Sequence, residues 1–534
     1  MARRVLAGMT GEEKDVWRGL AFRMRAPSPP AGRRRAVVLR LAAWAVLVVA
    51  AVVPVVQFQA GTMRRLREAT EFDRKHPDWF PAPAAVPRPG AHKGAIGRWR
   101  KAVRQFWQGR NIYQLPVRDP GGLATRPVSS VDCAADYGVA SMHPNCPFTV
   151  ILLSPFAYLP VWAMALSYNA AKLLALAATV LMCARLAGHG TRRVDDWVVL
   201  LGLLWAFSLA IADILHGNTN VFVLAGIVFH LWLYRRGHDG LAGLPLAAAI
   251  CLKMTPALFL LYWLYQRNWR LLAGTVLALV AFNVAVPAAA VGPSRGIDLT
   301  ATWYRNMIRP GLVEGSWYPQ HINQSLSGIV SRYFLSGQNG DIHWGPDDDP
   351  YYGTSRHGWI TLVALPETAA RWILRAGQAA IVALMAWAIG WRRLPRDDGR
   401  RALHYALVLL GMMLLNQRTW THHAAVLLPA GVAVWQAVAF GRVSRRVRAW
   451  TLGCVLAAGG LVWLGRGEAF QALGRLVGQT EAQSEAFADA AKAFGPTFYY
   501  FALMFAAAVI LAAALRRGED PYADRRQNLL HASS

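Results

Sequence analysis

The sequence consists of long blocks of apolar residues separated by polar stretches. Two of these blocks, residues 271–291 and 498–515, contain no charged residue. Apolar runs of about 18 residues or more are typical of membrane-spanning helices. The pattern therefore predicts an all-α polytopic membrane protein with about 12 transmembrane helices and long extracytoplasmic loops. The predicted spans are residues 36–58, 162–186, 198–215, 221–234, 241–252, 257–265, 271–291, 368–391, 402–415, 424–440, 450–464 and 498–515.

Arginine clusters give the predicted orientation of these spans. They occur in every second connection, and the positive-inside rule places such connections in the cytoplasm. The first apolar block is too long for a signal peptide, so we interpret it as an uncleaved anchor in a bacterial inner (plasma) membrane. Both ends of the chain are then expected to be cytoplasmic. The predicted domains are a basic segment at 1–35, one transmembrane domain at 36–516 and a tail at 517–534, with outer loops at 59–146, 292–366 and 465–495.

Two further segments are predicted, one within the first outer loop and one directly after it. Residues 96–109 carry apolar side chains at helical spacing, which predicts an amphipathic helix on the membrane surface. Residues 147–160 are apolar but are broken by Pro155 and Pro160, so we predict a re-entrant or interfacial segment there. Counting it as a span would break the alternation of the arginine clusters.

The net charge of +27 raises the question of a nucleic-acid partner. The arginines lie in the short connections between apolar blocks, where membrane insertion accounts for them. We therefore expect contact with membrane lipids and no nucleic acid.

Four polar groups lie at the predicted outer ends of spans, where polar residues are costly and usually functional. They are residues 216–220 (HGNTN), 253–256 (KMTP), 416–423 (NQRTWTHH) and a loop group with Tyr304, Arg305, Arg309 and 321–326 (HINQSL).

Each group also has a plain structural interpretation. The first is explained equally well by a turn with helix caps, and the third by an interfacial belt of Trp and His. Lys253 is either a snorkelling lysine or a phosphate-binding lysine at a helix break. His422 and His423 are adjacent and point to different faces of a helix, so we expect no shared metal ion.

The first outer loop adds carboxylates and cysteines. Transfer of a sugar to a hydroxyl needs a carboxylate to take the proton, and cations or dipoles opposite the leaving phosphate. The carboxylates are Glu71, Asp73, Asp78, Asp132 and Asp136. Cys133 and Cys146 are either disulfide-bonded or two free thiols. In the second loop, residues 347–349 (DDD) indicate a solvated acidic turn, since their spacing matches no calcium loop.

At these residues the chain resembles the integral-membrane GT-C glycosyltransferases of family 87, which use polyprenyl-phosphate sugars. Five motifs of that family occur in order between about residues 95 and 440. They are matched by Ala102, Gly109 and Tyr113; by a Pro-rich segment with His143, Pro144, Pro147, Pro155 and Phe156; by Gly217, Asn218 and Asn220; by Lys253 and Pro256; and by Trp420, His422 and His423. The resemblance implies a GT-C-like fold, a lysine that contacts lipid phosphate and a reaction without a metal ion or cofactor.

One family residue is missing at its expected place. The family's aspartate lies about seven residues before the alanine that matches Ala102, where this chain has residues 94–97 (GAIG). We expect the base to be displaced, first to Asp73 and otherwise to Asp136. The remaining alternatives are Asp78, Asp132 or a chain without transferase activity.

The sequence thus predicts a glycosyltransferase that moves mannose or another hexose or pentose from a polyprenyl-phosphate donor to a lipid or envelope glycan. Lys253, Arg305 and His422 are the expected phosphate contacts, with His423, Asn218, Asn220 and His143 also at the site. The alternatives are a transporter or flippase of lipid-linked sugars and an inactive assembly partner. No internal repeat is evident in the sequence, which disfavours a transporter.

Overall fold

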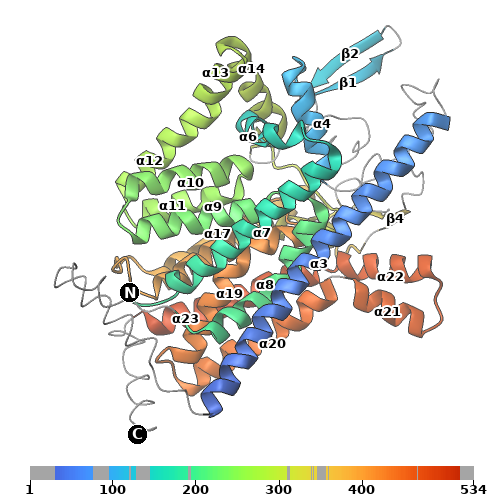
Figure 1. Cartoon of the computed structure of the whole chain (residues 1–534). Helices are drawn as coiled ribbons and strands as arrows, with labels where there is room; N and C mark the ends of the chain where they lie inside the picture. Colours follow the sequence, from blue (N-terminus) through green and yellow to red (C-terminus); the bar gives the residue numbers. More distant parts are fainter. Residues whose placement is uncertain are drawn as a thin grey trace, which may run out of the picture. The chain divides into compact units, whose positions relative to one another are not determined.

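The computed structural model describes residues 31–75, 95–119, 122–127, 145–190, 194–309, 313–337, 340, 342–344, 356–358, 360–465 and 467–516. The chain divides into two units, Met1–Val52 and Val53–Ser534, and the site described below lies within the second. Figure 1 shows the helices and strands of the described part. Helices make up most of the described part, as the apolar pattern predicts.

Eight helices in the described residues are long and apolar enough to cross a membrane. They are Arg40–Arg64, Val161–Leu186, Asp196–His216, Trp269–Val291, Glu367–Ile389, Thr421–Phe440, Arg445–Gly465 and Gln483–Leu515. Five shorter apolar helices accompany them, namely Pro147–Ala157, Asn220–Arg235, Asp239–Leu252, Thr255–Tyr265 and Arg401–Leu415. The protein is therefore a helical polytopic membrane protein with eight candidate spans. Four of the twelve predicted spans form the shorter helices instead.

The elements of these spans keep their chain order. They are α3 (Ala31–Lys75), α6 (Pro147–Ala157), α7 (Val161–Leu186), α8 (Asp196–His216), α9 (Asn220–Arg235), α10 (Asp239–Leu252), η2 (Thr255–Ala257), α11 (Leu258–Tyr265), α12 (Trp269–Val280), η3 (Ala281–Ala285), α13 (Val286–Val291), α17 (Glu367–Ile389), α18 (Arg401–Leu415), η7 (Thr421–Leu427), α19 (Leu428–Phe440), α20 (Arg445–Gly465) and α23 (Pro496–Leu515).

Helix α3 is longer than the predicted anchor. It continues beyond Phe58 to Lys75, so the first 17 residues of the predicted outer loop are helical. Residues 59–75 are polar, and the apolar pattern therefore ends before the helix does. They also contain four Arg, two Ala and two Glu, which have high helix propensity.

The two helices α18 and α19 lie at the centre of the second unit. Almost every side chain of α18 is buried, and 78% of the apolar window at Thr421–Phe440 is buried as well. A helix that is apolar on all sides is typical of a core position. This explains why α18, with only 15 residues, is apolar all round.

Helices α8 and α19 pack at close range because two glycines face each other. A Cβ atom on Gly202 would lie 2.5 Å from Val432 Cγ2 and 2.7 Å from its backbone N. On Gly431 it would lie 2.9 Å from the carbonyl O of Gly202. Small residues at a helix crossing allow such an approach in membrane proteins.

We expect Gly202→Val to destabilise the protein, because the added side chain has no space at this crossing. Overpacking of this kind costs about 1–3 kcal/mol. Thermal unfolding in detergent measures the effect. Gly460→Val is the matched control, since a Cβ there has no atom within 4 Å. Equal melting temperatures for the two variants would contradict the close packing of α8 and α19.

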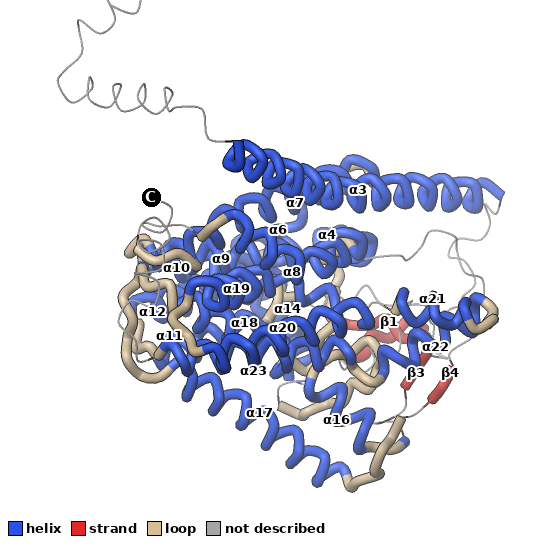
Figure 2. The backbone as a smooth tube through the Cα atoms, turned by 90° about the horizontal axis from the view of Figure 1, so that it is seen from below, coloured by secondary structure: helices blue, strands red, loops and turns tan. Residues whose placement is uncertain are grey.

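The remaining elements belong to the loops. They are α4 (Ala95–Trp107), β1 (Gln114–Asp119), β2 (Gly122–Pro127), α14 (Pro293–Trp303), η4 (Tyr304–Ile308), α16 (Leu326–Phe334), β3 (Ile342–Trp344), β4 (Arg356–Gly358), α21 (Glu468–Leu476) and α22 (Glu481–Ala493). The strands pair as two antiparallel hairpins, β1–β2 and β3–β4, which the all-α prediction did not include. Figure 2 shows the strands at one end of the bundle together with α21 and α22.

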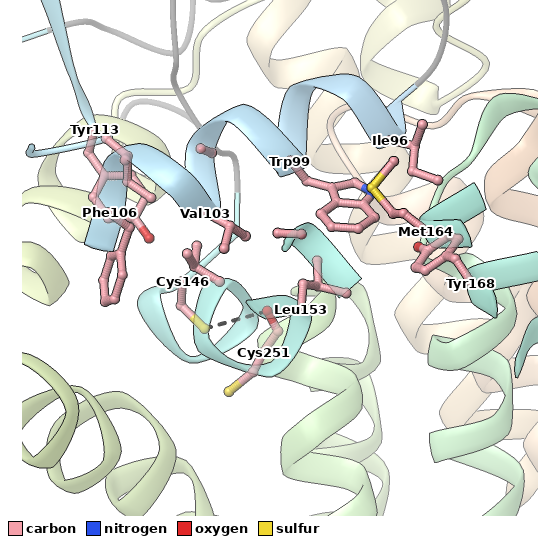
Figure 3. Packing of buried hydrophobic residues seen from close by; sticks show 14 of the residues in the cluster. Ile96, Trp99, Val103, Phe106, Tyr113, Cys146, Leu153, Met164, Tyr168 and Cys251 are labelled. Atoms are coloured by element: carbon pink, nitrogen blue, oxygen red, sulfur yellow. Dashed lines mark hydrogen bonds between the residues drawn. The ribbon is translucent and has the colours of Figure 1, made fainter. Parts of the chain in front are cut away.

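Helix α4 confirms the predicted helix at 96–109, but its apolar face does not lie outward. Trp99 is 3% exposed, and Val103 and Phe106 are fully buried. Figure 3 shows these side chains facing α6, with Trp99 close to Tyr168 of α7. The amphipathic pattern was correct, and the partner of the apolar face is protein instead of a lipid surface.

Candidate functional site

The centre of the site is the turn that joins α8 to α9. Helix α8 ends at His216, and Gly217 adopts a left-handed conformation with φ +67°. Its N–H donates to the carbonyls of Asp213 and Ile214, a common way to end a helix. Helix α9 then begins at Asn220, so that the HGNTN motif runs from the end of one helix to the start of the next.

Asp213 of α8 and Asn220 of α9 are joined across this turn. Both are fully buried. The Asp213 Oδ1 atom accepts the backbone N–H of Asn220 at 3.2 Å and its side-chain Nδ2 at 2.8 Å. Because the Nδ2 atom faces Asp213, the Oδ1 atom of Asn220 faces the other way.

Lys253 lies on that other side. Its Nζ donates to Asn220 Oδ1 at 2.8 Å. Helix α10 ends one residue earlier, and Lys253 itself is extended, with φ −163° and ψ 127°. Pro256 follows in the first turn of η2, where a proline is tolerated because its missing N–H would have no helical partner. The extended backbone of Lys253 therefore separates α10 from η2, and the KMTP motif forms a helix break.

The surroundings of Lys253 make its charge costly. The side chain is half-buried. Burial lowers the pKa of the Lys253 ammonium well below its ordinary value, and the nearby Asp213 carboxylate partly opposes this change. An anionic ligand in this position would be bound by an ammonium group that is poorly solvated.

Asn218 connects the turn to η7. Its Oδ1 accepts the N–H of Thr219 at 2.8 Å, so its Nδ2 is the donor to His422 Nε2 at 2.8 Å. With Nε2 as an acceptor, His422 carries its proton on Nδ1. The tautomer of His422 is therefore set by the amide of Asn218.

Aromatic rings surround this pair. His216 stacks on His422 with ring centroids 4.5 Å apart. Trp420 stacks on His423 at 5.8 Å, and its backbone N–H donates to His423 Nδ1 at 3.2 Å. The two adjacent histidines have ring planes 87° apart and bind different partners. This agrees with the expectation that they point in different directions.

The segment before His422 is held by the second loop. The Asn323 amide donates to the carbonyl of Gln417 at 2.9 Å and accepts the N–H of Thr419 at 3.0 Å. Arg332 is fully buried and donates to the carbonyls of Gln320 and Asn323. The predicted groups at 321–326 and 416–423 therefore form one hydrogen-bonded unit that positions Trp420 and His422.

The structure thus brings together Asn218, Asn220, Lys253, His422 and His423. It leaves Arg305 elsewhere: this side chain is exposed and donates to Ala301 and Thr302 of its own segment. Arg305 is therefore not part of this cluster of contacts.

Other predicted residues are described only in part or not at all. Asp73 lies in the last turn of α3, and its side chain is outside the description. Residues outside the described part are Asp78, Asp132, Cys133, Asp136, His143 and the run 347–349. Cys146 is a free, buried thiol whose Sγ lies 3.5 Å from the carbonyl of Cys251 (Figure 3). Among the described residues no cluster of three or more His, Cys, Asp or Glu could hold a metal ion.

A buried ion pair next to this cluster was not predicted from the sequence. Lys172 of α7 and Asp213 form an ion pair at 2.9 Å with both side chains fully buried. Neither residue belongs to the four polar groups that the sequence pattern identified. The available signal was a lysine and an aspartate of opposite charge within two apolar blocks.

Comparisons with known proteins confirm the resemblance to family 87. Residues 144–417, just over half of the chain, match the family described as glycosyltransferase family 87. This match includes Asn218, Asn220 and Lys253, ends shortly before His422, and excludes Asp73 and Asp136.

Curated relatives come from mycobacteria. The polyprenol-phosphate-mannose-dependent alpha-(1-2)-phosphatidylinositol mannoside mannosyltransferase of Mycobacterium tuberculosis (strain ATCC 25618 / H37Rv) is 25% identical over 307 residues, 54% of this chain and 62% of the relative. The polyprenol-phosphate-mannose-dependent alpha-(1-2)-phosphatidylinositol pentamannoside mannosyltransferase of strain CDC 1551 / Oshkosh is 26% identical over 342 residues, 62% of this chain and 67% of the relative. The matches thus span about two thirds or less of these relatives. Among solved structures, apo ArnT from Cupriavidus metallidurans covers 79% of this chain and 73% of its own, with a TM-score of 0.32 and 14% identity.

Proposed function

The chain belongs to glycosyltransferase family 87, and from this premise we propose that it transfers a sugar from a polyprenyl-phosphate donor to a lipid or envelope glycan. Mannose is the first donor sugar to test, because two relatives are named as polyprenol-phosphate-mannose-dependent. The reaction takes place on the extracytoplasmic face of a GT-C-like fold, with both chain ends in the cytoplasm. Phosphatidylinositol mannosides, which these relatives are named for, are the first acceptors to test.

The observation that carries this proposal is the position of Lys253. The ammonium lies in a helix break, half-buried, and is held by Asn220 next to the Asn218–His422 pair. When the sugar leaves, negative charge develops on the lipid phosphate. A cation already fixed opposite that phosphate stabilises the transition state. Lys253 has the charge and the position for this role.

His422 has a second, neutral role in the proposal. The Asn218 amide occupies its Nε2, which leaves the Nδ1–H as the donor of the ring. A neutral imidazole donor binds a phosphate or sugar oxygen without adding a second buried charge. His216 and Trp420 then form the walls that orient this ring.

The acceptor hydroxyl needs a base, and Asp73 remains our first assignment. It lies nine residues beyond the end of the candidate span Arg40–Arg64, on a continuous helix. At about 1.5 Å per residue, α3 projects Asp73 roughly 13 Å past that span. Asp136 is the second assignment.

Sealed vesicles test the function directly. Purified protein is reconstituted into liposomes with radiolabelled polyprenyl-phosphate mannose and an extract of envelope lipids. A transferase converts the label into a new glycolipid. Movement of unchanged donor across the membrane would indicate a flippase, and neither conversion nor movement with any donor sugar would indicate an assembly partner. Either result contradicts the proposal.

We also expect the reaction to depend on pH through Lys253. Its pKa is lowered, so the ammonium loses its proton at a lower pH than an ordinary lysine. Only the protonated form neutralises the phosphate, and KM for the donor should therefore rise as the pH increases through this lowered pKa. Lys253→Arg keeps its charge throughout and should remove this rise. If KM of the Lys253→Arg variant rose with pH as the KM of wild type does, the titrating group would not be Lys253.

A further inference from the structure

A fully buried ion pair between two apolar helices needs an explanation. Lys172 and Asp213 are both 0% exposed, and Lys172 Nζ also donates to the carbonyl of Asp213 at 3.0 Å. Removing two charges from water costs several kcal/mol per ion, and an apolar pair of similar size is often equally stable or better. Stability alone therefore does not account for charged residues here. Charged residues inside membrane proteins are generally functional.

The side chain of Asp213 accepts hydrogen bonds and donates none. A carboxylate can only accept hydrogen bonds. Its Oδ1 accepts twice from Asn220, and its Oδ2 faces Lys172. This arrangement compels Asn220 to present its donor to Asp213 and its acceptor to Lys253. A neutral amide in place of Asp213 would offer both a donor and an acceptor, and would not enforce that orientation.

The same carboxylate fixes the start of α9. It accepts the N–H of Asn220, the first residue of the helix, where an unpaired N–H group and the positive end of the helix dipole favour an anion. Asp213 also accepts at its backbone oxygen from Asn218, the partner of His422. Asp213 therefore contacts both Asn220, which binds Lys253, and Asn218, which binds His422.

We propose that Lys172 and Asp213 are positioning residues for the donor phosphate, acting through Asn220 on Lys253. Lys172 pairs with the Oδ2 atom of Asp213, the Oδ1 atom of Asp213 orients the Asn220 amide, and the amide oxygen holds the Lys253 ammonium in place. The identification of the ligand as a phosphate ester rests on the proposed function. The geometry of the relay itself does not depend on that function.

The test replaces both charges together by apolar residues of similar size, Lys172→Met with Asp213→Leu. Because neither charge is left unpaired, the pair variant should fold, with a lower melting temperature because two donors of Asn220 lose their acceptor. We expect its KM for polyprenyl-phosphate mannose to rise roughly tenfold, with a smaller change in kcat, because a charge-assisted contact is lost. Thr179→Val is the matched control, since Thr179 is also fully buried in α7 and donates only to Ala175 of its own helix. A folded pair variant with the KM of wild type would overturn the relay and leave the transferase proposal standing.

A second measurement needs no enzymatic activity. An amine-reactive acylating reagent is applied at fixed pH, and the extent of Lys253 modification is followed by peptide mass spectrometry. We expect modification to become several-fold faster in the pair variant, because Lys253 loses its oriented acceptor and the nearby carboxylate. It should remain unchanged in Thr179→Val. Equal rates in wild type and the pair variant would overturn the relay even if wild type transferred no sugar.

Discussion

Asp73→Asn should reduce sugar transfer by roughly 10²–10⁴-fold, which is the range that a general base contributes. The amide is nearly the same size as the carboxylate but does not take the proton of the acceptor hydroxyl. We expect the loss to appear in kcat with the donor KM little changed, because the base acts on the acceptor. Initial rates with purified protein in liposomes measure both constants.

The neighbouring carboxylate provides the control for Asp73. Glu71 lies on the same helix, is exposed and forms an ion pair with Lys75 at 2.8 Å. Surface pairs of this kind contribute little, so Glu71→Gln should retain transfer. Full activity in Asp73→Asn together with a large loss in Asp136→Asn would move the base to Asp136. Full activity in both would remove both assignments.

Lys253→Met should produce the second largest loss, about 10²–10³-fold in kcat/KM, the range for removal of one preorganised donor from a transition state. The methionine fills a similar volume without a charge. Since Lys253 faces the leaving phosphate in our proposal, both the donor KM and kcat should change. Kinetics with varied donor concentration separate the two effects.

Another lysine of the described residues serves as the control. Lys492 of α22 forms an ion pair with Asp489 at 3.0 Å and has no assigned role in the reaction. Lys492→Met should stay close to wild type. A loss of similar size in both lysine variants would show that the defect is a general effect of removing a cation, and our role for Lys253 would be wrong.

Local sequence patterns predicted most of the helices, and they also marked the turn at Gly217 and the helix break at Lys253. The apolar runs identify α7, α8, α12 and α20, and Pro256 lies just after the helix break at Lys253. Gly217 marks the turn that ends α8. Such signals depend on neighbours within a few residues, and the structure confirms them.

Contacts between distant segments were not predictable in the same way. Lys172 and Asp213 are 41 residues apart, and their pairing depends on how α7 packs against α8. The two hairpins were missed because they lie in polar loops without an apolar alternation. The contact between Asn218 and His422 joins residues 204 positions apart, and it was suggested only by the order of the family's motifs.

The most direct test of the central claim is the fate of the donor on the purified protein. Wild type and Lys253→Met are placed in lipid nanodiscs with polyprenyl-phosphate mannose and a phosphatidylinositol mannoside, and the lipids are analysed by mass spectrometry. The account predicts that wild type produces polyprenyl phosphate together with an acceptor heavier by one mannose, and that Lys253→Met produces far less of both. A donor that stays intact with wild type, for this acceptor and for a whole envelope-lipid extract and with other donor sugars, would contradict it.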